Sequence, residues 1–352
     1  MNIDLELLRK LPKTDLHCHL DGSMRVATIL ELAKKNSVEL PTTDEEQLKK
    51  LVQMDENCKS LVDYLQAFGI TTKVMQDYDS LKQIAFELAE DAAKENIRYL
   101  EVRYAPCLHQ ERGLKLTHIV DAVLEGLKQG EKNYDIKTGI IICGLRHLNP
   151  ASALELADLT IAYKNRGVVA FDLAGAEYDY PAKDFKEAFS RVINNLINST
   201  VHAGEAFGPD SISQALRYCG AHRIGHGTRL IEDGDLLNYV NDHRIALEVC
   251  LTSNVQTCAV ESFKTHPLKM YYDLGLRITL NTDNRLVSNT DMTTELFRAA
   301  NTFNMSISDI ANIILNGFKS AFTPYSEKQK LIRNAIKELD KLVGTRKNEY
   351  HY

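Results

Sequence analysis

The chain alternates along its whole length between short apolar runs rich in β-branched residues and amphipathic stretches with helical spacing. Such alternation indicates parallel strands covered by helices, because each strand is then buried on both faces. Eight undivided units predict a (β/α)8 barrel (TIM barrel), for which about 250 residues is typical. The eight candidate strands lie, within 352 residues, at 14–19, 98–106, 137–146, 167–175, 199–205, 222–228, 245–253 and 276–283.

The residues beyond a minimal barrel are expected to form extra helices, inserted after the first strand and added at the C-terminus. The largest insertion covers about residues 24–79, and the stretches 80–96 and 183–197 each place apolar residues on one helix face. No linker rich in proline, glycine or serine interrupts the sequence. We therefore expect residues 1–352 to form a single domain.

The amino-acid composition limits the kinds of molecule that the chain is expected to bind. The formal net charge is -6, so the chain has no basic field to attract nucleic acid or an anionic membrane. We find no apolar leader at the N-terminus and no stretch long enough to span a bilayer. Seven cysteines occur without a C-x-x-C pair, which favours reduced thiols and a cytoplasmic protein. These features indicate a protein that acts on a small molecule.

The first candidate strand carries two histidines in "TDLHCHLDGS", at His17 and His19. Side chains two residues apart project from the same face of a strand, here the barrel interior. In barrels of this kind the chemistry is built at the carboxyl ends of the strands. We therefore expect both imidazoles at that end of the barrel.

Three other candidate strands end in similar residues. His202 and Glu205 close the fifth run, His226 closes the sixth, and Asp283 closes the eighth. Since these ends meet at one rim, the sequence predicts a cluster of imidazoles and carboxylates there.

Imidazole nitrogens and carboxylate oxygens are the usual ligands of a zinc-like ion. Such an ion lowers the pKa of bound water to about 7, which makes a nucleophile available at neutral pH. Glu205 and His226 are then free to act as acid and base. The candidate ligands are His17, His19, His202 and Asp283.

Each of these residues also has a simpler interpretation. A lone H-x-H pair is a weak signal, and His202 or His226 alone fits a hydrogen-bonded core histidine. Asp283 fits a turn or helix cap, and Glu205 fits a solvent-facing position. Their joint occurrence at independently assigned strand ends favours the metal site.

An ordered set of motifs then resembles the adenosine deaminase family across about residues 10–290. The resemblance implies an amidohydrolase-type (β/α)8 barrel with one Zn²⁺ per chain. It also implies a purine-salvage enzyme that converts adenosine, and 2′-deoxyadenosine, to inosine and ammonia, with a purine nucleoside as its small-molecule partner. The motifs are "TDLHCHLDGS", "EVRYAP", "DLAGAE", "VHAGE", "RIGHG", "EVCLTSN" and "LNTDN".

By the same resemblance, Glu205 would protonate purine N1 and His226 would position and deprotonate the attacking water beside Asp283. The Gly175 N–H would meet purine N3, and Asp21 would contact the ribose 5′-hydroxyl. An apolar stripe in 60–69, otherwise readable as helix packing, resembles a lid over the ligand. The implied substrate-binding residues are His19, Asp21, Gly175, Asn284, Leu61, Tyr64, Leu65 and Phe68.

One position departs from the family pattern, because Asn284 stands where many members carry aspartate. The position is expected to contact purine N7, a hydrogen-bond acceptor. An amide N–H2 donates to such an acceptor, whereas a carboxylate must first be protonated. The change is compatible with a purine and leaves the choice among aminopurines open.

Three alternatives stay open from the sequence. A two-metal amidohydrolase bridged by a modified lysine is disfavoured, because the run 167–175 contains no lysine. Adenine or a modified adenosine is a second candidate substrate. A non-catalytic nucleoside-binding relative is disfavoured by the complete set of candidate ligands and acid. The other zinc deaminase architecture needs a C-x-x-C motif that the chain lacks.

Overall fold

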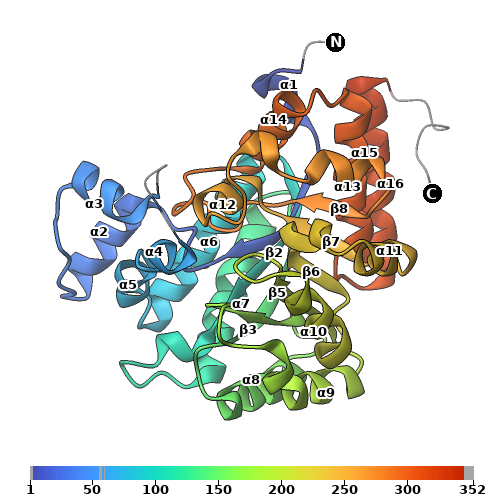
Figure 1. The fold of residues 1–352 in the computed structure, drawn as a ribbon. Coiled ribbons are helices and arrows are strands. Elements are labelled where there is room, and N and C mark those ends of the chain that lie inside the picture. The colour runs from blue at the N-terminus through green and yellow to red at the C-terminus, as the bar shows by residue number, and fades with distance from the viewer. Residues whose placement is uncertain (1–2, 55–57, 59, 345–352) are drawn as a thin grey trace.

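The computed structural model describes residues 3–54, 58 and 60–344. Its strands pair in parallel, in chain order, within one eight-stranded sheet that curls into a nearly closed barrel (Figure 1). The predicted (β/α)8 fold is confirmed. The strands are β1 (Lys13–His19), β2 (Ile97–Tyr104), β3 (Lys137–Leu145), β4 (Val168–Ala174), β5 (Asn198–Ala203), β6 (Arg223–His226), β7 (Ala246–Val249) and β8 (Ile278–Leu280).

Helices surround the sheet, and none in the described part of the chain has the length and apolar character needed to cross a bilayer. Short 3-10 helices among the described residues are η1 (Thr72–Val74), η2 (Pro106–His109), η3 (Ala182–Phe185), η4 (Thr228–Glu232) and η5 (Phe263–Thr265). The α-helices are α1 (Leu5–Lys10), α2 (Val26–Lys35), α3 (Glu45–Val52), α4 (Leu61–Leu65), α5 (Phe68–Thr71), α6 (Tyr78–Lys94), α7 (Leu116–Asn133), α8 (Pro150–Ala162), α9 (Lys186–Asn194), α10 (Pro209–Cys219), α11 (Gly234–Asp242), α12 (Leu251–Gln256), α13 (Leu268–Asp273), α14 (Met292–Thr302), α15 (Ile307–Ser320) and α16 (Tyr325–Val343).

The extra helices lie where the sequence predicts them. Helices α2 to α5 fill the insertion after β1 and sit on one side of the barrel, while α15 and α16 flank the other side (Figure 1). Helix α6 illustrates how the local sequence defines an element. The Asp77 side chain caps it by accepting from the Ser80 N–H, and its apolar stripe, Leu81, Ile84 and Leu88, is buried.

The barrel is joined between β8 and β1 by a short parallel bridge just beyond β8. Cys18 pairs with Asp283, whose backbone N–H donates to the His17 carbonyl at 2.8 Å. The His19 N–H donates to the Asp283 carbonyl at 2.7 Å. Backbone pairing therefore fixes Asp283 beside the two histidines of β1.

Several expected strands end earlier in the structure. Strand β5 stops at Ala203 and β8 stops at Leu280, so Glu205 and Asp283 lie in the loops that follow. The apolar runs continue past the strands because these loops are themselves buried. Burial alone does not distinguish a strand from a covered loop.

A layer of buried charges crosses the barrel interior, where apolar side chains would be usual. Arg103 lies 3.1 Å from Asp172 and 2.8 Å from Glu248. Arg223 lies 2.5 Å from Glu248 and 2.5 Å from Glu101. Each charge has an opposite partner, which offsets the cost of removing it from water.

We expect Glu101→Gln to lower the free energy of unfolding by about 3–5 kcal/mol, because it leaves Arg223 with one carboxylate fewer in a fully buried position. The variant also weakens the acceptor of the Phe322 N–H, now 2.6 Å from Glu101. Urea denaturation of Glu101→Gln beside Glu39→Gln, an exposed loop position, measures the difference. Equal stability of the two variants would contradict this account.

Candidate metal and substrate site

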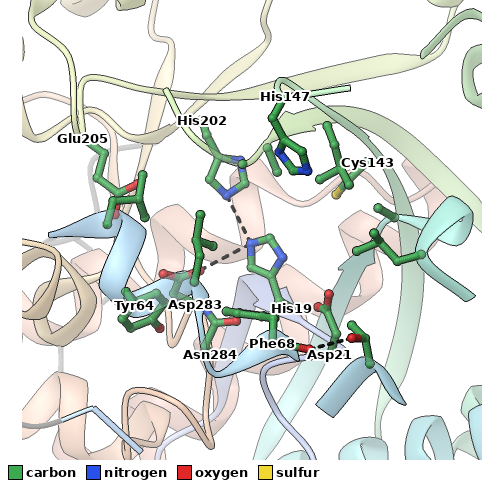
Figure 2. A pocket seen from close by; sticks show the side chains of 18 of the residues that line it. His19, Asp21, Tyr64, Phe68, Cys143, His147, His202, Glu205, Asp283 and Asn284 are labelled. Atoms are coloured by element: carbon green, nitrogen blue, oxygen red, sulfur yellow. Dashed lines mark hydrogen bonds and ion pairs between the residues drawn. The ribbon is translucent and has the colours of Figure 1, made fainter. Parts of the chain in front are cut away.

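A pocket of about 350 Å³ opens at the carboxyl ends of the strands, within the size range of small-molecule sites. Figure 2 shows the ring of His19 between His202 and Asp283. Among its walls are twelve residues that the sequence predicts for the site: His19, Asp21, Leu61, Tyr64, Leu65, Phe68, Gly175, His202, Glu205, His226, Asp283 and Asn284.

The imidazoles and Asp283 converge at the base of the pocket. His19 Nε2 lies 3.1 Å from His202 Nε2 and 3.4 Å from Asp283 Oδ1. His17 Nε2 lies 3.3 Å from the same Asp283 oxygen. The ligand atoms of His17, His202, His226 and Asp283 all lie within 4.8 Å of one another. His19 lies outside this group of four, but its Nε2 contacts His202 and Asp283 at the edge of the same centre.

Two buried carboxylates set which imidazole nitrogens face this centre. His17 Nδ1 lies 2.9 Å from Glu248, and His202 Nδ1 lies 3.0 Å from Asp172. An ionised carboxylate only accepts, so each Nδ1 carries the proton and each Nε2 presents a lone pair. Metal-binding histidines are held by carboxylates in this way.

The convergence of lone pairs fits a cation. His17 Nε2 is buried and has no hydrogen-bond partner among the described residues. His19 Nε2 lies beside His202 Nε2 and a carboxylate oxygen of Asp283. Acceptors repel one another unless a proton or a cation lies between them. The nitrogen and oxygen donors suit a zinc-like ion.

Two site residues adopt left-handed backbone conformations that side chains other than glycine rarely take. The φ angle is 62° at His226 and 59° at Asp283. Such strain is tolerated where surrounding contacts over-determine the position, and it is common at functional sites. Asp283 is held by its β1 bridge and by Ser253, whose hydroxyl donates to Oδ2 at 2.6 Å.

Glu205 lies on the loop after β5, on the wall of the pocket (Figure 2). Its Oε1 accepts from the Thr257 hydroxyl at 3.0 Å, and its Oε2 lies 3.6 Å from His226 Nε2. Burial, together with the negative charges of Asp283 and Glu177, raises the pKa of Glu205 well above its ordinary value. This carboxyl group is suited to hold a proton at neutral pH.

Glu177 supports the Glu205 loop and was not predicted from the sequence. Its buried carboxylate accepts from four successive backbone N–H groups, at 2.7 Å from Gly204 and 3.0 Å from Glu205. The Ala206 and Phe207 N–H groups lie at 2.6 Å and 3.0 Å. The carboxylate therefore fixes the backbone that presents Glu205 to the pocket.

The outer pocket brings together the residues predicted to contact substrate. Gly175 has φ 90°, and a Cβ there would lie 3.1 Å from His147 Nδ1, so glycine suits both backbone and space. Asp21 is buried, which raises its pKa to about 7. Asn284 Oδ1 is buried without a hydrogen-bond partner in the described chain. His147 also lines the pocket.

The apolar stripe covers the pocket from α4 and α5. Tyr64 donates to or accepts from the Ser288 hydroxyl at 2.7 Å, and it packs with Val287. Leu65 and Phe68 are partly exposed and face the cavity. Tyr64, Ala67 and Val287 form a small buried apolar cluster apart from the main core, whereas Ile70 of α5 packs against the main core itself.

Several supporting residues escaped sequence reasoning. Three of them are acidic residues inside or beside apolar runs, namely Asp172, Glu248 and Glu177. A lone charge in an apolar run is unusual, and this pattern is the sequence signal that could have identified them. Asn254 and Thr257 carry no such signal, because polar uncharged residues are common near strand ends.

Comparison with known proteins identifies the family of this chain. The sequence model of the adenosine deaminase family matches residues 12–338. A probable adenosine deaminase of Dictyostelium discoideum is 41% identical over 343 residues, which cover 97% of this chain and only 44% of that protein. An adenosine deaminase of Clostridium acetobutylicum is 40% identical over 340 residues, 97% of this chain and 100% of the relative.

A solved structure shares the fold. The adenine deaminase of Arthrobacter aurescens superposes with a TM-score of 0.88 at 26% identity, covering 95% of this chain and 100% of its own.

We expect Glu177→Gln to loosen the loop at 204–207, because an amide presents N–H2 to one of the four N–H groups that the carboxylate now binds. Hydrogen exchange of these amides should accelerate, and the free energy of unfolding should fall by about 1–3 kcal/mol. Glu187→Gln, exposed on α9, is the matched control. Unchanged exchange at 204–207 would refute the loop-holding role.

Proposed function

Because the chain belongs to the adenosine deaminase family, we propose that it hydrolyses the 6-amino group of adenosine. Water adds at C6 of the purine and ammonia leaves, so adenosine and water become inosine and ammonia. We extend the proposal to 2′-deoxyadenosine and to a role in purine salvage. The observation that carries it is one pocket that joins a cation-binding cluster to a buried carboxyl group.

His17, His19, His202 and Asp283 would hold one Zn²⁺ per chain. Lone pairs of two carboxylate-held imidazoles, and their contacts with Asp283 and His19, support this ligand set. When bound, zinc supplies a Lewis acid that lowers the pKa of water to about 7. The pocket walls contain no lysine within the described chain, which disfavours a two-metal site bridged by that residue.

Glu205 would protonate N1 of the purine. Addition at C6 places negative charge on N1, so an acid at that atom stabilises the transition state. The raised pKa of Glu205 keeps its proton available near neutral pH. The Thr257 hydroxyl occupies Oε1, which leaves Oε2 for the substrate.

The attacking water needs a group that orients it and a group that accepts its proton. His226 and Asp283 both face the centre and are the two candidates for these roles.

Three polar contacts would hold the nucleoside. The Gly175 N–H would donate to N3 and the Asn284 amide to N7, since both ring nitrogens are acceptors. Asp21 would meet the ribose 5′-hydroxyl. Leu61, Tyr64, Leu65 and Phe68 would cover the ring and exclude bulk water, which strengthens the polar contacts inside.

A nucleoside fits these walls better than a nucleotide or a free base. The pocket residues include no arginine or lysine in the described chain, and Asp21 would repel a 5′-phosphate. Adenine, the substrate named for the Arthrobacter aurescens enzyme, would leave Asp21 without a hydroxyl partner. Deamination of adenine is therefore the less favoured alternative function.

The decisive assay follows the ultraviolet change as adenosine is consumed. Metal-stripped protein should be inactive and about one equivalent of zinc should restore turnover. Adenosine should exceed adenine and adenosine 5′-monophosphate in kcat/KM. Activity that survives metal removal, or a preference for adenine, would overturn the assignment.

Replacing Glu205 with glutamine should reduce kcat by about 10²–10⁴-fold, because an amide cannot deliver a proton to N1. The variant should bind zinc as the parent does, since Glu205 is not among the proposed ligands. Metal content and steady-state kinetics together measure the effect. Near-normal turnover would remove Glu205 from the mechanism.

A further inference from the structure

The imidazoles at the centre differ in what their Nδ1 atoms meet. His17 and His202 face carboxylates, which accept hydrogen bonds. His226 Nδ1 instead lies 2.9 Å from the side-chain amide of Asn254, on the first turn of α12. An amide end can donate or accept, so the state of His226 depends on which way the amide is turned.

A backbone group decides this orientation. The Leu268 N–H donates to His266 Nδ1 at 3.0 Å, and a backbone N–H cannot turn round to accept. His266 Nδ1 is therefore a lone pair, and the neutral ring carries its proton on Nε2. Burial lowers the pKa of His266 to about 3, in keeping with the neutral ring.

The proton on His266 Nε2 points at Asn254. His266 Nε2 lies 3.2 Å from Asn254 Oδ1, so the amide oxygen accepts there and the N–H2 group is turned to His226. Donation from Asn254 makes His226 Nδ1 an acceptor. The remaining proton of His226 must lie on Nε2, the nitrogen 3.6 Å from Glu205 and facing the centre.

We propose that Asn254 and His266 are positioning residues that lock His226 in the tautomer with its proton on Nε2. In the proposed deaminase, on which this role rests, His226 then donates a hydrogen bond to the attacking oxygen. His266 is buried, and its Nε2 is hydrogen-bonded to the Asn254 amide oxygen.

Two consequences follow for the division of labour. A protonated Nε2 offers no lone pair, so His226 does not join the metal ligands although its ring lies in their cluster. It also cannot take the proton of the attacking water. As the water O–H bond breaks, the electron pair stays on the oxygen that bonds to C6. The proton goes to the carboxylate of Asp283.

The test is nuclear magnetic resonance of protein labelled with ¹⁵N-histidine, in metal-free and zinc-loaded forms. Long-range ¹H–¹⁵N spectra distinguish protonated from unprotonated ring nitrogens, and His226→Asn identifies the His226 signals. We expect His226 to carry its proton on Nε2 alone. A proton on Nδ1, or on both nitrogens, would overturn the proposal whether or not the protein deaminates adenosine.

The Asn254→Asp variant tests the proposal by enzyme kinetics. A carboxylate at 254 accepts only, so His226 should move its proton to Nδ1 and lose its donor toward the substrate. We expect kcat to fall by about 10²–10³-fold, as for loss of one transition-state donor, with KM changed less than about threefold. Asn301→Asp, the same change on the exposed face of α14, should leave kcat and the His226 spectrum unchanged.

The His266→Phe variant separates the contribution of His266 from that of Asn254 in the hydrogen-bond relay from His266 through Asn254 to His226. Without the His266 proton, the Asn254 amide is free to turn, so His226 should show both tautomers and kcat should fall less than in Asn254→Asp. Parent-like kcat and spectra in both variants would contradict the relay. If adenosine is not a substrate, the spectra of the parent still decide the tautomer.

Discussion

The site depends on the guanidinium of Arg103, buried between Asp172 and Glu248 in the barrel interior. Burial alone would raise the pKa of these carboxyl groups and leave them neutral. Despite burial, Arg103 and Arg223 hold the pKa of Glu248 well below its ordinary value. The ionised carboxylates can then accept the Nδ1 protons of His17 and His202, which turns both Nε2 lone pairs toward one point.

The closure of the barrel supplies the other half of the arrangement. Asp283 is bound to β1 by backbone hydrogen bonds, so its carboxylate is carried to the histidines by strand pairing rather than by a flexible loop. The left-handed φ at Asp283 and His226 is retained because such contacts over-determine both residues. A rigid barrel therefore tolerates local strain where charged and polar groups must converge.

Sequence patterns predict the parts of this molecule that depend on local spacing. The i, i+2 relation of His17 and His19 and the alternation of strands with helices place the candidate ligands at one rim, as the structure has them. The supporting partners depend on contacts between distant segments. His266 lies in a loop with no local signal, and its role emerges only where the fold sets it against Asn254.

The buried charges of the barrel interior also favour an amide, rather than a carboxylate, at position 254. Arg103 already forms ion pairs with two buried carboxylates. The candidate metal centre is rich in hydrogen-bond acceptors, which need a cation. A carboxylate at 254 would add a buried negative charge, which is costly in a low-dielectric interior. Asn254 supplies a directed hydrogen bond to His226 with no net charge. Chemically identical imidazoles can thus take different roles, because carboxylate partners create lone pairs at the centre and an amide partner creates a donor.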